Sequence, residues 1–126
     1  MIIKIDKGTM ERVGSVTLDA GEDDVRAIHF DTSTSALYAS TNTVPGHVVK
    51  IDTIGMKRVA AATLSLGKNL TVSFADDKFI FVSSNTEPAV VSKIAQKSML
   101  VHTEKSVAHG KSIATMAADE DHLYCG

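Results

Sequence analysis

Residues 48–67 read VVKIDTIGMKRVAAATLSLG, and residues 2–21 read IIKIDKGTMERVGSVTLDAG. At a constant offset of 46 residues, apolar positions in the two stretches match in kind and many residues are identical. Chance is a poor explanation for so many identities at one offset, which indicates an internal repeat. The identities include Lys4 and Lys50, Asp6 and Asp52, Met10 and Met56, Arg12 and Arg58, and Gly21 and Gly67.

The repeat extends beyond these two stretches. ALYASTNTVPG at 36–46 matches FIFVSSNTEPA at 79–89 at an offset of 43 residues, and ADDKFIFVS at 75–83 returns as ADEDHLYCG at 118–126. A weaker third copy of the opening stretch includes Lys93. We therefore predict a single repeat region over residues 1–126, with about three repeats of 43–46 residues at approximately 2–47, 48–89 and 90–126.

Each repeat divides into four short runs. In the first repeat these runs are IIKID, RVGSVTL, VRAIHF and ALYAST, separated by segments rich in Gly, Asp, Ser and Asn. Alternating runs of this length between turn residues predict β-strands. Four strands per repeat of about 44 residues are typical of a β-propeller blade, so we predict an all-β chain of about three four-stranded antiparallel blades. A β-sandwich is the second alternative, since it fits the strand spacing but has no reason to repeat at a fixed period.

One segment also fits a helix. In residues 89–101, Val91, Ile94 and Met99 are spaced as one face of a helix, and the segment holds Lys and Gln, which favour helices. The same segment is in register with the better copies of the repeat. We therefore favour strand–turn–strand and keep the helix as the alternative.

These repeats resemble the YVTN/WD40-like β-propeller group. The similarity lies in VVKID…M.RV…L..G and in ALYAST.T.PG.VVKID, and it covers nearly the whole chain, loosely in the third repeat. The motifs are specific for a fold and weak for an activity. The resemblance implies strand positions from the centre of the propeller outward, named A to D. Strands A are 25–30, 70–74 and 113–116; strands B are 36–41, 79–83 and 122–125; strands C are 2–6, 48–52 and 90–94; strands D are 12–18, 58–64 and 100–107.

In this assignment the chain opens with strands C and D and closes with strands A and B, so its two ends supply the halves of one blade. Three blades do not normally close into a ring, because propellers usually have 4–8. We therefore expect either a partial propeller or a homodimer that completes a six-bladed ring. Unpaired edge strands would otherwise be an aggregation hazard.

Composition narrows the classes of partner. The net charge is −2, aromatic residues make up 5% of the chain, and Lys and Arg are scattered singly, so neither nucleic acid nor a membrane is an expected partner. The single cysteine, Cys125, is expected to be a buried small hydrophobe. The absence of a signal segment predicts a cytoplasmic location for the chain as given, although a piece of a longer secreted protein would look the same.

A search for chemistry finds no catalytic or metal-binding constellation, so we expect no enzyme activity and no cofactor. The five histidines form no HxxxH or HxH pair, there is no GxSxG, and GKS at 110–112 lacks the upstream glycine of a phosphate loop. The recurring Asp6 and Asp52 predict turns or strand ends. The acidic runs 22–24 and 119–121 predict a solvated loop and a tight turn.

What remains is the loop surface. In a propeller, the D–A and B–C loops lie together on one face, and loops on a rigid scaffold commonly bind ligands. We therefore predict a non-enzymatic interaction or scaffold module that binds a protein or peptide there. The alternative is a metal-dependent, lactonase-like hydrolase with a site in the central channel. The candidate binding residues are Asp23, Asp24, Asn42, His47, Lys68, Asn69, Asn85 and His109.

Overall fold

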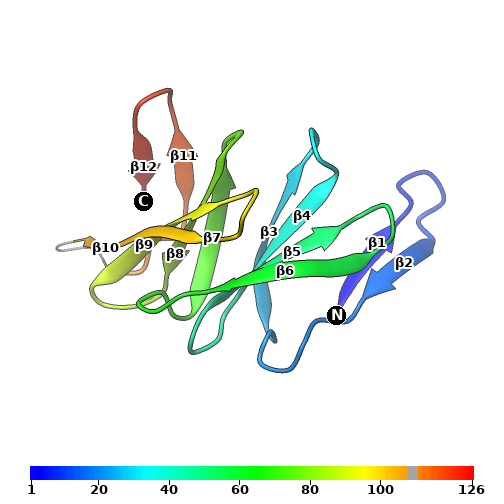
Figure 1. The fold of residues 1–126 in the computed structure, drawn as a ribbon, viewed down its shortest axis with the longest axis horizontal. Helices are drawn as coiled ribbons and strands as arrows, with labels where there is room; N and C mark the ends of the chain where they lie inside the picture. The colour runs from blue at the N-terminus through cyan, green and yellow to red at the C-terminus, as the bar shows by residue number, and fades with distance from the viewer. Residues whose placement is uncertain (108–110) are drawn as a thin grey trace.

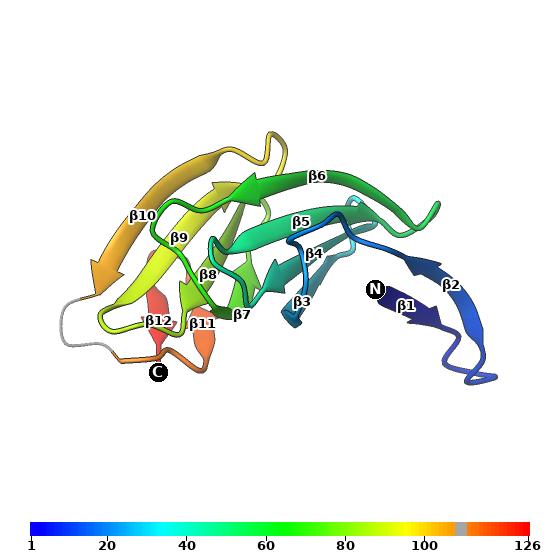
Figure 2. The ribbon, with the colours of Figure 1, turned by 90° about the horizontal axis from the view of Figure 1, so that it is seen from below.

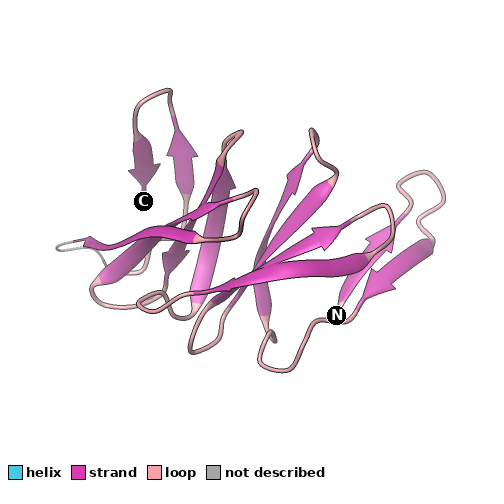
Figure 3. Ribbon diagram, viewed as in Figure 1, coloured by secondary structure: helices cyan, strands magenta, loops and turns pink. Residues whose placement is uncertain are grey.

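The computed structural model of the chain describes residues 1–107 and 111–126. The regular secondary structure in these two ranges consists of β-strands, without a helix (Figure 3). The strands are β1 (Ile2–Ile5), β2 (Arg12–Val16), β3 (Val25–Asp31), β4 (Ala36–Thr41), β5 (His47–Asp52), β6 (Lys57–Thr63), β7 (Leu70–Ala75), β8 (Phe79–Ser84), β9 (Ala89–Ala95), β10 (Val101–Val107), β11 (Met116–Ala118) and β12 (Leu123–Cys125).

The strands form two complete blades and two half-blades. Each complete blade is a four-stranded antiparallel sheet in chain order, β3-β4-β5-β6 or β7-β8-β9-β10. Each half-blade is an antiparallel pair, β1-β2 or β11-β12. The sheets follow one another along the long axis of the molecule without closing into a ring (Figures 1 and 2). The predicted fold class, an all-β partial propeller, is therefore confirmed.

The segment 89–101 is strand–turn–strand, as the repeat predicted. Met99 ends the turn with its N–H donating to the carbonyl of Ala95 at 2.8 Å, and its φ of 56° is incompatible with a helix. Met10 and Met56, at the same position of the other repeats, have φ values of 59° and 50°. The apolar spacing that also fitted a helix arises because Met99, although in a turn, packs into the hydrophobic cluster between the two complete blades.

Strand bounds differ from the prediction mainly in the third repeat. Strand A there begins at Met116 rather than Ile113. The hydroxyl of Thr71, on the neighbouring blade, donates to the carbonyl of Ile113 at 2.9 Å, while the N–H groups of Ala114 and Thr115 both donate to Gly126. The N–H of Gly126 also donates to Thr115, so this pair continues the β11-β12 ladder by one position, while Ile113 lies before the ladder and is buried.

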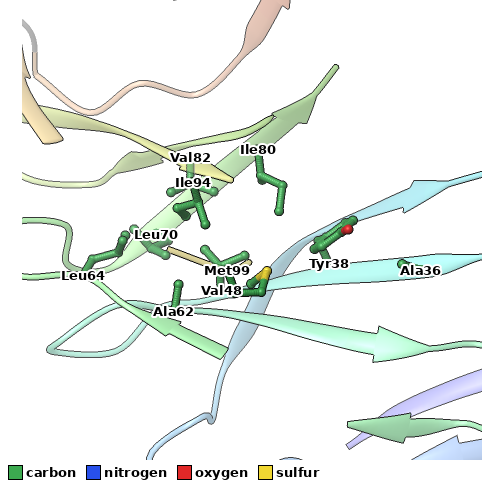
Figure 4. Close-up of a cluster of buried hydrophobic side chains, with 10 residues drawn as sticks. All are labelled: Ala36, Tyr38, Val48, Ala62, Leu64, Leu70, Ile80, Val82, Ile94 and Met99. Carbon is green, nitrogen blue, oxygen red and sulfur yellow. The ribbon is translucent and has the colours of Figure 1, made fainter. Parts of the chain in front are cut away.

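Two hydrophobic clusters join the sheets. One lies between the two complete blades and contains Tyr38, Val48, Leu64, Ile80, Ile94 and their neighbours (Figure 4). The other packs β1-β2 on the back of the first complete blade through Ile2, Val16, Ala39, Val49 and Ile51. Neighbouring residues such as Val48 and Val49 point to opposite faces of a sheet and are both fully buried. Burial on both faces explains why the strand C runs are continuously apolar.

Aspartates close the turns, as the sequence predicted. Asp6 accepts hydrogen bonds from the N–H groups of Gly8 and Thr9 at 2.8 and 2.9 Å, and Asp52 accepts equivalent bonds from Ile54 and Gly55. These backbone donors lower the pKa of both carboxyl groups. The repeated aspartate is therefore a turn residue.

The expected burial of Cys125 is wrong, because its side chain is exposed. It lies on β12, which pairs only with β11 among the described strands. Ala39 and Val82 occupy the same position of the complete blades and are both fully buried. Cys125 is exposed because, among the described strands, β12 lacks the neighbours that cover Ala39 and Val82 in the complete blades.

Candidate functional site

The D–A and B–C connections lie along one side of the molecule, away from the β3–β4 and β7–β8 turns (Figure 1). We call this side the loop face. It consists of the connections 17–24, 42–46, 64–69 and 85–88. The shared location agrees with the arrangement expected from the repeat.

A series of backbone hydrogen bonds holds these connections together. The N–H of Asn42 donates to the carbonyl of Asp24 at 2.8 Å, that of Asn69 to Thr43 at 2.9 Å, and that of Asn85 to Asn69 at 2.9 Å. Asp24 and Asn69 occupy equivalent positions, and both have a φ of 48°. The loops therefore form one continuous surface, and four of the predicted residues take part in its hydrogen-bonded series.

Within this surface, the Asp24 side chain contacts two neighbouring residues, Arg26 and Asn42. The side-chain amide of Asn42 donates to its carboxylate at 2.7 Å, and Arg26 forms an ion pair with it at 2.9 Å. The hydrogen bonds from Arg26 and Asn42 lower the pKa of Asp24.

The remaining predicted residues are more separate. Asp23 and Lys68 are exposed. His47 begins β5, and its Nδ1 lies 3.1 Å from the hydroxyl of Thr63. His109 lies outside the described residues, so its predicted place on this face has no structural description.

Glu22 corrects the expectation of a solvated acidic loop. Its side chain is only 5% exposed, and its carboxylate pairs with the guanidinium of Arg58 on β6 at 2.5 and 2.8 Å. The hydrogen bonds from Arg58 lower the pKa of Glu22, although burial opposes this shift. Glu22 therefore joins the first D–A loop to strand D of the next blade.

Glu104 plays the corresponding part at the second D–A loop, and the sequence analysis missed it. Its carboxylate accepts hydrogen bonds from the N–H groups of Ser65, Leu66 and Gly67 at 2.9–3.2 Å and from the hydroxyls of Ser65 and Ser92. Nothing in VHTEKSV marks this glutamate, because its partners in the loop, Ser65, Leu66 and Gly67, lie 37–39 residues away in the sequence.

Glu104→Gln is expected to destabilise the fold by about 1–3 kcal/mol at neutral pH, because a half-buried carboxylate that accepts several hydrogen bonds loses its charge and one acceptor oxygen. Burial raises the pKa of Glu104, but the hydrogen bonds from Ser65 and the loop N–H groups outweigh it, so the pKa falls below its ordinary value of 4.5. The stabilisation is therefore present above pH 4.5 and is lost as the pH falls through the folded-state pKa.

Urea unfolding at pH 7 and at successively lower pH measures this effect. The gap between the two proteins is expected to shrink as the pH falls below 4.5, because protonated Glu104 resembles glutamine. A gap that stays constant down to pH 3 would show that the charge of Glu104 does not stabilise the loop.

A shallow groove of about 250 Å³ crosses the loop face between the β6–β7 and β8–β9 connections. Leu66 is an exposed apolar side chain on its wall, 50% exposed, and Lys68 and Glu87 place both signs of charge beside it. The groove can therefore contact an apolar side chain that has polar neighbours. Its lining residues are Ser65, Leu66, Lys68, Thr86, Glu87, Pro88, Val90 and Ser106.

A larger groove of about 450 Å³ lies on the opposite side, between the β7–β8 and β11–β12 turns. Its floor is aromatic, with the Lys93 ammonium 4.0 Å from the Phe79 ring centre. Asp76 and Asp119 lie on its walls, but both accept hydrogen bonds from the N–H groups of their own turns. The acidic run at 119–121 thus serves the tight turn predicted from the sequence.

Within residues 1–107 and 111–126, no group of three or more His, Cys, Asp or Glu side chains is placed to hold a metal ion. In the same ranges, no helix is long and apolar enough to cross a membrane. No family model matches the chain, and no curated protein is found to match it.

Proposed function

We propose that the protein is a non-enzymatic interaction module of the propeller type that binds a protein or peptide through the loop face. The resemblance of its repeats to the YVTN/WD40-like group supports this proposal, since such scaffolds commonly display loops for binding. The partner is a polypeptide, and the bound segment lies across the β6–β7 and β8–β9 connections.

The observation that carries the proposal is the hydrogen-bonded series through Asp24, Asn42, Thr43, Asn69 and Asn85. Because backbone groups make these links, they fix the loops with little dependence on the side chains. A preformed surface loses little conformational entropy when a partner binds. The groove beside Leu66 offers an apolar contact on that fixed surface.

Selection of a displayed peptide library on the immobilised protein tests the proposal. We expect enriched peptides whose affinity falls at least about tenfold in the double variant Leu66→Ala/Lys68→Ala, because a few central contacts dominate such interfaces. The matched control is Lys97→Ala/Leu100→Ala, which changes one exposed lysine and one exposed leucine at the β9–β10 turn. The control is expected to bind with unchanged affinity.

Two results would contradict the proposal. One is that no peptide is enriched over the naked support. The other is that enriched peptides bind the loop-face variant normally but lose affinity when Phe79 is replaced by alanine, which would place binding in the groove on the opposite side. Far-UV circular dichroism of each variant excludes unfolding as the cause of lost binding.

We also propose that two copies of the chain form a six-bladed ring. Each copy contributes two complete blades and two different half-blades, and the halves together contain the four strands of a third blade. Two copies would then have six blades, within the usual propeller range of 4–8. A closed assembly of identical chains requires a symmetric arrangement, here a twofold axis along the centre of the ring.

A further inference from the structure

The two half-blades expose complementary edges. Within the described residues, β1 pairs only with β2, and β12 pairs only with β11. The two pairs lie at opposite ends of the molecule in both views, so β1 and β12 do not meet within one copy (Figures 1 and 2). An unpaired edge presents a row of N–H and C=O groups to any strand that fits it.

The complete blades show which pairing would join these edges. Strands β4 and β5 place Tyr38 opposite Lys50 and Ala39 opposite Val49. Strands β8 and β9 keep the same register, with Phe81 opposite Lys93 and Val82 opposite Ser92. Carried over at the repeat offsets of 43 and 46 residues, this register places Tyr124 opposite Lys4, and Cys125 opposite Ile3.

Exposure differs strongly between these positions and their equivalents in the first complete blade. Val49 and Ile51 are fully buried in the first complete blade, whereas the equivalent Ile3 and Ile5 are each 50% exposed. Tyr38 is 1% exposed, whereas its equivalent Tyr124 is 56% exposed. Val49 and Ile51 are buried under the β1-β2 pair, and Tyr38 is buried against the second complete blade. Ile3, Ile5 and Tyr124 therefore become buried if joining the two half-blades brings complete blades onto these faces.

The surface beside β1 contains a space that matches Tyr124. An apolar cavity of about 390 Å³ opens there, and its walls repeat the surroundings of Tyr38 in Figure 4. Ile2, Leu37 and Met56 of the cavity are the equivalents of Val48, Ile80 and Met99, which surround Tyr38.

The lysine beside the Tyr38 ring also has an equivalent at the cavity, which is Lys4 in place of Lys50. The Lys50 ammonium lies 5.8 Å from the Tyr38 ring centre and donates to the Gln96 carbonyl at 3.1 Å. The ammonium of Lys4 already donates to the carbonyl of Thr53, the equivalent of Gln96, at 3.0 Å. Lys4 is therefore in place to lie over an aromatic ring that enters the cavity beside Phe30.

We propose that β1 pairs in antiparallel fashion with β12 of a second copy, whose Tyr124 fills this cavity beneath Lys4. The second copy offers the same two edges, so a second identical junction joins its β1 to the β12 of the first. The proposed six-bladed ring is needed only to set the number of copies at two, and the β1–β12 pairing itself does not depend on it. It is independent of what the loop face binds.

Disulfide trapping tests the register. Cys125 is the only native cysteine, so Ile3→Cys places two thiols opposite each other across the junction. With diamide as oxidant, which accepts the two electrons and two protons of each thiol pair, we expect a covalent dimer on a non-reducing gel. Ile5→Cys is the matched control, since Ile5 has the same strand, face and exposure as Ile3.

Ile5→Cys is expected to cross-link at least about tenfold more slowly, because its thiol would lie diagonal to Cys125 at about 7–8 Å. Equal rates for the two variants would overturn the register. Trapping of Ile3→Cys in species of three or more chains would support the pairing and overturn the two-copy ring. That outcome separates the two proposals.

A second pair of variants tests the cavity without cysteine chemistry. Tyr124→Ala is expected to raise the dimer dissociation constant at least about tenfold, while Tyr124→Phe keeps the ring and changes it little. Analytical ultracentrifugation of the wild-type protein is expected to give twice the 13.4 kDa chain mass. A folded wild-type monomer at micromolar concentration, with a native β-sheet spectrum, would overturn the inference.

Discussion

Arg58→Met is expected to destabilise the fold by about 3–5 kcal/mol, because it leaves the charge of Glu22 buried without its cationic partner. The Glu22 side chain is 5% exposed and accepts two short bonds from Arg58, one of them at 2.5 Å. Methionine keeps much of the apolar stem of arginine, so the decrease in the free energy of unfolding comes mainly from the lost charge rather than from lost packing. Urea unfolding at pH 7 measures it.

A double-mutant cycle supplies the control. The variant Glu22→Met/Arg58→Met is expected to be more stable than Arg58→Met alone, because an apolar pair replaces a buried ion pair at little cost. Arg26→Met removes the cation of the exposed pair with Asp24 and is expected to cost less than about 1 kcal/mol. A double variant as unstable as the single one would show that Arg58 acts through packing rather than through Glu22.

Ile80→Ala is expected to destabilise the fold by about 2–5 kcal/mol, since it leaves a cavity in the cluster between the two complete blades. Ile80 is fully buried there beside Tyr38 and Met99 (Figure 4). The substitution removes apolar contacts between the two complete blades. Because this lowers the free energy of unfolding, the midpoint of thermal unfolding is expected to fall by several degrees.

Ile54→Ala is the matched control, because Ile54 is 82% exposed in the β5–β6 turn. It is expected to change the free energy of unfolding by less than about 0.5 kcal/mol. If Ile80→Ala is equally mild, the blades do not depend on each other for stability. A single cooperative unfolding transition in the wild-type protein would show that the two complete blades unfold together.

Strand positions were predictable because the repeat supplied two independent copies of most patterns. The segment 89–101 shows the value of this comparison, since its own apolar spacing also fitted a helix. Its register with 48–52 and 58–64 favoured strand–turn–strand, and the structure confirms that prediction. The start of β11 was not predictable, because the hydroxyl of Thr71 from a neighbouring blade engages Ile113.

The loop face was partly predictable for the same reason. Repeat phase alone places the D–A and B–C connections on one side, and Asp24, Asn42, Asn69 and Asn85 indeed form one hydrogen-bonded series. Which acids leave the solvent, fully or in part, was not predictable. Glu22 and Glu104 resemble solvated glutamates in the sequence, and only contacts with Arg58 and with the loop N–H groups distinguish them.

The sequence by itself determined the repeat, the four-strand blade and the phase of the strands, because these depend on period and on local turn chemistry. Asp6 and Asp52 illustrate such local determinants, since each binds N–H groups two and three residues ahead. Only the tertiary structure decided which side chains are buried, because burial depends on the neighbouring sheet. Tyr38 and Tyr124 occupy the same repeat position, and only Tyr38 has a blade packed against it.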